Sequence, residues 1–80
     1  MIPLYGFLQG DTIGLLVLAY SHETAEQVAH KLVQMAQTRV KNKGECQLFY
    51  QGEVVPAAVT MSSLGARALD RIDVRWRAHE

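Results

Sequence analysis

The sequence predicts an α+β protein in which one main helix packs on one face of a mixed five-stranded sheet. Two observations lead to this prediction. Five short segments have the apolar or alternating pattern of strands, and only one stretch repeats its apolar residues at helical spacing. One helix laid on one face of one sheet is the simplest packing that buries both apolar surfaces.

The length and composition of the chain exclude several classes of protein. Its 80 residues are enough for a single domain, 1–80, with a small core, and the 49% apolar content excludes a disordered chain. The formal net charge is zero, so the basic excess that favours nucleic acid or an acidic membrane surface is absent. One cysteine, no basic leader and no long apolar run indicate a cytoplasmic protein without a membrane segment.

The first twenty residues predict a hairpin. Residues 2–9 and 13–20 are apolar with strand preference, and Gly10 and Asp11 between them supply a turn. The second segment is expected to form an edge of the sheet.

The main helix is predicted to begin after Thr24. Thr24 is the expected N-cap, and Gln27 three residues later completes a capping box. Asn42 or Gly44 is expected to end the helix. The apolar stripe that predicts it consists of Val28, Ala29, Leu32, Met35, Ala36 and Val40.

The second half of the chain supplies three more strands. Residues 46–50 and 54–56 flank a turn, and a helical turn is expected near Thr60. Residues 71–77 alternate, with Ile72, Val74 and Trp76 on the buried side. The resulting order is that of a ubiquitin-like β-grasp, in which the first and last strands run parallel in the middle of the sheet.

Three polar residues near the helix are spaced by four, but they do not predict a metal site. If Thr24 caps the helix, His22 precedes it, and only Glu26 and His30 remain as a surface pair. A metal centre needs three or four converging ligands, so no metal ligand is assigned. The third histidine, His79, is expected in the C-terminal tail.

No other residue pattern predicts catalysis by this chain. Cys46 opens a strand with no neighbouring base and is expected to be a small buried side chain. The glycines match no phosphate-binding loop. The chain ends without glycine, so activation as a ubiquitin-like modifier is not expected. We therefore assign no catalytic and no cofactor-binding residue.

The second strand is more apolar than a half-exposed edge strand should be. Its alternation turns Leu15, Val17 and Ala19 toward the helix. An edge strand normally carries polar residues or a lysine on its other side, and this strand has neither. The sequence thus predicts a docking surface made of Leu16, Leu18 and Tyr20, with Phe49 and Arg75 on the same sheet face. The alternative is a different register, in which the first strand covers more of the second.

The segments "TAEQVAHKLV…RV" and "VVPAAVTMSSLGARALDRIDVRW" and the apolar strand before them resemble a known family. It is the small gamma subunit, toluene monooxygenase system protein B-like, of the hydroxylase component of bacterial multicomponent di-iron aromatic and alkene monooxygenases. The similarity runs nearly end to end. Residues 46–50 depart from it, being more apolar than the family's basic third strand.

The resemblance implies a non-catalytic, ubiquitin-like subunit that docks on the large alpha chain of an alpha-beta-gamma hydroxylase. The di-iron centre is then expected in the alpha chain and no cofactor in this one. The complex adds one oxygen atom of O₂ to an aromatic or alkene substrate, drawing on NADH through a reductase and a ferredoxin. The rival hypothesis is a free-standing ubiquitin-like adaptor or homodimer that pairs through its apolar edge strand.

Overall fold

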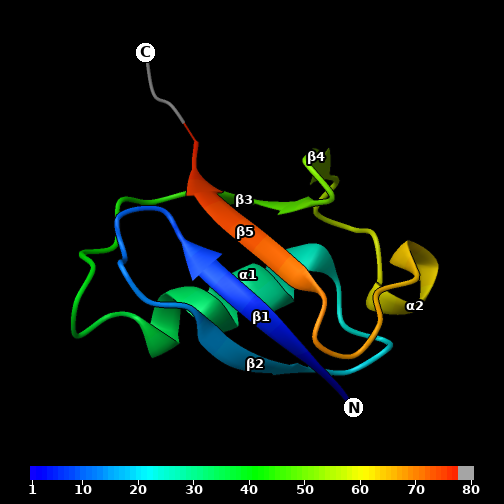
Figure 1. Ribbon diagram of the computed structural model, residues 1–80. Coiled ribbons are helices and arrows are strands. Elements are labelled where there is room, and N and C mark those ends of the chain that lie inside the picture. The colour runs from blue at the N-terminus through cyan, green and yellow to red at the C-terminus, as the bar shows by residue number, and fades with distance from the viewer. Residues whose placement is uncertain (78–80) are drawn as a thin grey trace.

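A computed structural model describes residues 1–77 of the chain (Figure 1). The elements alternate as the sequence predicts, with a hairpin, a helix, a second hairpin, a short helix and a last strand. In chain order they are β1 (Ile2–Leu8), β2 (Leu15–Ala19), α1 (Ala25–Met35), β3 (Cys46–Tyr50), β4 (Glu53–Val55), α2 (Met61–Leu64) and β5 (Arg71–Trp76).

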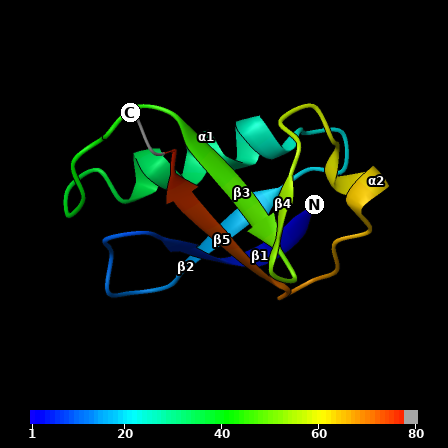
Figure 2. The same cartoon turned by 90° about the horizontal axis from the view of Figure 1, so that it is seen from above.

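The five strands form one sheet in the order β2-β1-β5-β3-β4. β1 and β5 run parallel at its centre, and every other neighbouring pair is antiparallel. Figure 2 shows α1 as a separate layer along one face of this sheet, while the opposite face carries no helix. The predicted β-grasp, with its parallel centre and β2 at an edge, is confirmed.

The core lies between α1 and the sheet. Each strand contributes the alternate residues that point toward the helix, and α1 contributes its inner stripe. Gly6 lies below Leu32, and a Cβ at Gly6 would approach the Leu32 methyl carbon to 2.9 Å. The fully buried large side chains are Leu4, Val17, Val28, Leu32, Leu48, Met61, Ile72 and Val74.

The start of α1 agrees with the prediction. The Thr24 side chain accepts a hydrogen bond from the Gln27 backbone N–H, and the Gln27 side chain accepts one from the Thr24 N–H. His22 therefore lies outside the helix, as expected.

The predicted end of the helix is wrong. α1 stops at Met35, which is 44% exposed, and not at Asn42 or Gly44. Residues 36–39 form turns, so that Val40 folds back into the core. The guanidinium of Arg39 then reaches the carboxylate of Asp11 with two nitrogens, at 2.9 and 3.1 Å. This contact joins residues 28 positions apart, which the helical period alone does not reveal.

The strand boundaries shift by one or two residues from those predicted. β4 begins at Glu53 and ends before Pro56, which cannot donate to a ladder. Gln51 and Gly52 both have positive φ, 53° and 83°, which is the geometry of a two-residue type I′ turn.

Candidate functional site: the open face of the sheet

The sheet face opposite α1 is apolar over β1 and β2. Leu16 pairs with Tyr5, and Leu18 pairs with Pro3. Leu16, Leu18 and Tyr5 are 49, 46 and 47% exposed, whereas Val17 between the two leucines is fully buried. The predicted register of β2 is therefore correct, and the alternative register is excluded.

The centre of this face carries a row of charges between two aromatic rings. β5 presents Arg71, Asp73 and Arg75, and Asp73 pairs with Phe7 on one side and Phe49 on the other. The Arg71 guanidinium lies 4.2 Å from the centre of the Phe7 ring, and that of Arg75 lies 4.7 Å from the Phe49 ring. Such stacking holds a long cationic side chain flat against the sheet.

The five predicted docking residues do not form one contiguous cluster. Strands lie about 4.8 Å apart and three such steps separate β2 from β3, so Leu16 and Leu18 are at least about 14 Å from Phe49. Between them lie Asp73 of β5 and, on β1, the apolar side chains of Pro3, Tyr5 and Phe7. The odd-numbered apolar positions of "PLYGF" are the sequence signal that would have found them.

Tyr20 lies beyond the end of β2, at the outer edge of the sheet. Its ring is 5.1 Å from the Lys31 ammonium and 5.8 Å from the His22 ring. It therefore borders the edge, whereas Leu16 and Leu18 lie on the open face.

That edge is protected by a residue from the helix. The Lys31 ammonium donates to the Leu18 carbonyl oxygen at 2.7 Å and to the Glu23 carboxylate at 2.6 Å, and Glu23 also accepts the Tyr20 N–H at 2.7 Å. Burial raises the pKa of the Glu23 carboxyl, but these hydrogen bonds outweigh it and the net pKa is lowered. The lysine that the strand itself lacks is thus supplied thirteen residues later.

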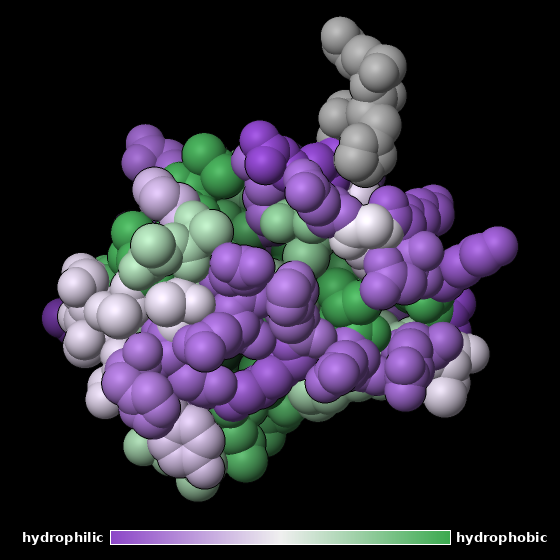
Figure 3. All heavy atoms as spheres, turned by 180° about the vertical axis from the view of Figure 1, so that it is seen from behind, coloured by the Kyte–Doolittle hydropathy of each residue, from purple (hydrophilic) through white to green (hydrophobic). Residues whose placement is uncertain are grey.

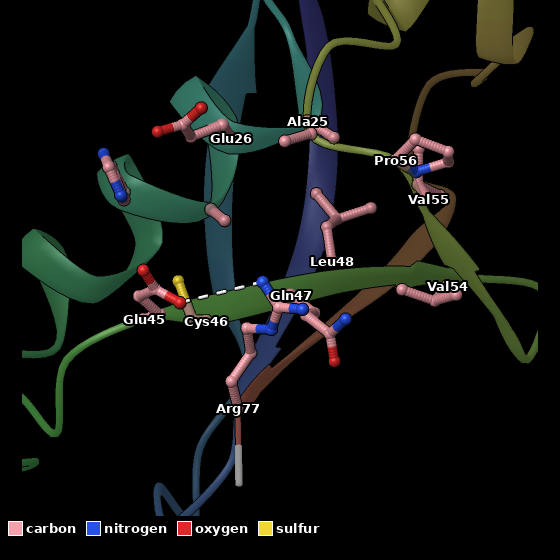
Figure 4. A pocket seen from close by; sticks show the side chains of 13 residues that line it. Ala25, Glu26, Glu45, Cys46, Gln47, Leu48, Val54, Val55, Pro56 and Arg77 are labelled. Atoms are coloured by element: carbon pink, nitrogen blue, oxygen red, sulfur yellow. Dashed lines mark ion pairs between the residues drawn. The ribbon is translucent and has the colours of Figure 1, made fainter. Parts of the chain in front are cut away.

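A hollow of about 470 Å³ lies on the other side of the molecule, between α1 and β3 (Figure 4). The thiol of Cys46 points into it from β3, with Glu26 on the helix opposite. Cys46 is half-buried, so the expected buried position is wrong, because the side chain borders this hollow. Desolvation and the Glu26 charge raise the pKa of this thiol, so it is a poor nucleophile.

The polar residues near this hollow do not assemble a metal site. Glu26 and His30 are both exposed, and no ion pair joins them, so the surface pair predicted from their spacing does not form. Within residues 1–77 there is no group of three or more His, Cys, Asp or Glu side chains that could hold a metal ion. His79 lies outside the described residues. A di-iron centre therefore does not fit the described part of this chain.

The helix side of the molecule is mostly hydrophilic (Figure 3). Polar and charged side chains cover the middle of that face, in contrast to the leucines and tyrosine of the open face. No helix of the described chain is long and apolar enough to cross a membrane. The asymmetry between the two faces makes the open face the candidate site of binding.

The fold and this surface define a ubiquitin-like protein with an exposed apolar sheet face. One solved structure with this fold is the ubiquitin of Caldiarchaeum subterraneum, with a TM-score of 0.78, 19% identity, and coverage of 98% of this chain and 95% of that chain. A chain of "Toluene 4 monooxygenase HD Complex with Inhibitor 4-Bromobenzoate" matches with a TM-score of 0.86, 21% identity, and coverage of 95% and 98%.

The family model of toluene-4-monooxygenase system protein B (TmoB) matches residues 1–76. The chain belongs to this family and is a component of a monooxygenase system, as the resemblance implied. No curated protein sequence matches the chain significantly.

Proposed function

We propose that this chain is the non-catalytic gamma subunit of an aromatic or alkene monooxygenase hydroxylase, and that it stabilises the assembled alpha-beta-gamma complex in the cytoplasm. Its family membership supports a place in such a complex. The di-iron centre then belongs to the alpha chain, where it would activate O₂. The role of this chain is to bind and hold that partner.

The observation that supports docking is the exposed apolar half of the open face. Tyr5, Leu16 and Leu18 are each about half exposed in the isolated chain. Completing their burial would contribute about half of the roughly 1.5–3 kcal/mol that full burial of such a side chain supplies. An uncovered patch of this kind typically marks a protein contact.

The charged row beside this patch adds specificity to the proposed contact. Arg71 is paired with Asp73 at 3.0 Å, whereas Arg75 has no carboxylate within 4.0 Å among residues 1–77. An acidic residue of the alpha chain opposite Arg75 would complete the pairing, since arginines on aromatic rings are frequent anchors of interfaces.

The rival hypothesis, pairing of the β2 edge with another strand, is disfavoured by Lys31. The Pro3 carbonyl accepts the Leu69 N–H on the side away from β2, so Pro3 and Leu18 form a non-hydrogen-bonded pair. The Leu18 carbonyl therefore points away from β1, toward the open edge. This is one of the acceptors that an added strand would use, and Lys31 already occupies it. We therefore place the partner on the face of the sheet and not along its edge.

Leu18→Asp tests the proposal. The tagged subunit is co-expressed with the other hydroxylase chains, and the chains recovered with it are quantified by mass spectrometry. We expect the wild type to recover a large iron-containing chain, and Leu18→Asp to recover about tenfold less, equivalent to 1.4 kcal/mol.

The matched control is Gln34→Asp, which adds the same charge at an exposed position of α1 on the opposite side. It should leave recovery unchanged, and circular dichroism should show both variants folded. Recovery of the wild type alone, without a large iron-containing chain, would refute the proposed function.

A further inference from the structure

Leu69 is an exposed leucine held in a backbone conformation that leucine disfavours. Its φ is 66°, in the left-handed region, and its side chain is 57% exposed. Apart from Gln51 in the β3–β4 turn, it is the only non-glycine residue among residues 1–77 with positive φ. Outliers of this kind concentrate at functional positions.

The fold of the described residues does not explain why this position is a leucine. The turn before β5 is fixed by Asp70, whose carboxylate accepts the Arg67 N–H at 2.9 Å and the Tyr50 hydroxyl. The Leu69 backbone N–H donates to the Pro3 carbonyl at 2.6 Å, a bond that any residue except proline would make. The Leu69 side chain belongs neither to the core nor to the residues packed against it. A glycine would form the same turn without strain.

The position of Leu69 links it to the apolar half of the open face. Tyr5 pairs with Arg71, so two residues earlier Pro3 lies opposite Leu69, in agreement with their hydrogen bond. Pro3 also pairs with Leu18 on its other side. Leu18 on β2, Pro3 on β1 and Leu69 just before β5 therefore lie side by side, in that order, at one end of the sheet.

We propose that Leu69 is an anchor of the same interface, and that it inserts into an apolar hollow on the hydroxylase chain that covers Leu16 and Leu18. This inference rests on the proposed function and extends the contact beyond the sheet to the loop before β5. Leucine at this position lowers the stability of the free subunit. It adds binding free energy only when the partner buries its side chain.

The test separates binding from folding, because Leu69→Gly should weaken incorporation into the complex without lowering the stability of the isolated chain. Cells co-express the other hydroxylase chains with two versions of the subunit, one wild type and one variant, which intact mass distinguishes. The ratio of the two in the purified complex measures their relative affinity. We expect Leu69→Gly to be incorporated about tenfold less than wild type, although the isolated full chain melts at the same or a higher temperature.

Gln51→Gly is the matched control. Gln51 is also exposed and also has a left-handed backbone, but it lies in the β3–β4 turn, on the side of β5 that faces away from β1 and β2. It should be incorporated as well as wild type. Leu69→Asn is the second variant, because asparagine tolerates the left-handed region and removes the apolar contact.

Equal incorporation of Leu69→Gly and wild type would overturn the inference while leaving the proposed function intact. Lowered melting temperatures of both Leu69 variants would overturn it as well, since Leu69 would then act through the fold. Self-association of the isolated chain that depends on Leu69 would place a second copy there and contradict the stated partner. Failure of the wild type to enter any complex would instead refute the proposed function, and this inference with it.

Discussion

The ammonium of Lys31 lies 2.7 Å from the backbone carbonyl oxygen of Leu18 and so closes part of the exposed edge of the sheet. The same nitrogen contacts the Glu23 carboxylate, which holds the lysine in place. Lys31 thus supplies a charged side chain at the edge of a strand that has none of its own, and such charges disfavour pairing with another strand. Loss of Lys31 is expected to expose the edge.

Lys31→Met is therefore expected to promote self-association. Methionine keeps most of the aliphatic stem but leaves the Leu18 carbonyl free to accept from a second β2 strand. Sedimentation velocity should show dimerisation about tenfold tighter than that of the unchanged chain. Lys43→Met, in the loop before β3, removes the same charge away from the edge and should not change the sedimentation profile. Identical behaviour of both variants would show that Lys31 does not protect the edge.

The ion pair of Asp11 and Arg39 predicts loss of stability in acid. The Arg39 guanidinium hydrogen-bonds the Asp11 carboxylate, whose side chain is only 2% exposed, and lowers the pKa of Asp11 below its usual range. A lowered pKa in the folded state means that the carboxylate stabilises the fold at neutral pH. This contribution is lost as the pH falls through that lowered pKa, below about pH 4.

Urea unfolding between about pH 7 and pH 2 measures this effect. The midpoint should fall in acid for the wild type, and Asp11→Asn should lower the midpoint at pH 7 and flatten its acid dependence. Asp73→Asn is the comparison, because Asp73 pairs with the more exposed Arg71. An equal effect of both substitutions would contradict the special role of the Asp11 pair.

The close approach of Gly6 and Leu32 predicts that a single methyl group will destabilise the core. In Gly6→Ala the new Cβ would lie 2.9 Å from Leu32 and 3.0 Å from Val17. Overpacking of this size costs typically about 1–3 kcal/mol, which urea unfolding should detect. The double variant Gly6→Ala with Leu32→Val should be less destabilised than the sum of the two single variants, because the smaller side chain makes room. Strict additivity would mean that the two positions do not compete for space.

The capping box of α1 predicts a measurable cost for removing its hydroxyl. Thr24→Ala leaves the Gln27 N–H without its acceptor and should lower the free energy of unfolding by about 1 kcal/mol. For a domain of this size that corresponds to a melting temperature about 4–8 °C lower. Thr24→Ser keeps the oxygen and should restore most of the loss. Similar melting of Thr24→Ala and Thr24→Ser would contradict the role of the cap.

Features that depend on neighbours along the chain could be predicted from the residue pattern. The alternation in "LLVLA" placed Val17 in the core and Leu16 and Leu18 on the open face, because successive side chains of a strand point to opposite sides. The pattern of Thr24 and Gln27 fixed the start of the helix, because a capping box is made within four residues. The order of strands and helix was sufficient to predict the β-grasp.

Features that join distant segments could not be predicted in this way and appear only in the folded chain. Arg39 reaches Asp11 and Val40 enters the core, so α1 ends at Met35 although the apolar period continues. Lys31 protects a strand that lies well before it, and Leu69 comes to lie beside Pro3. These contacts depend on where the loops return the chain and on which side chains then meet. A periodic pattern predicts which side of its own helix or strand a residue faces. It does not predict which residue from a distant segment will contact that side.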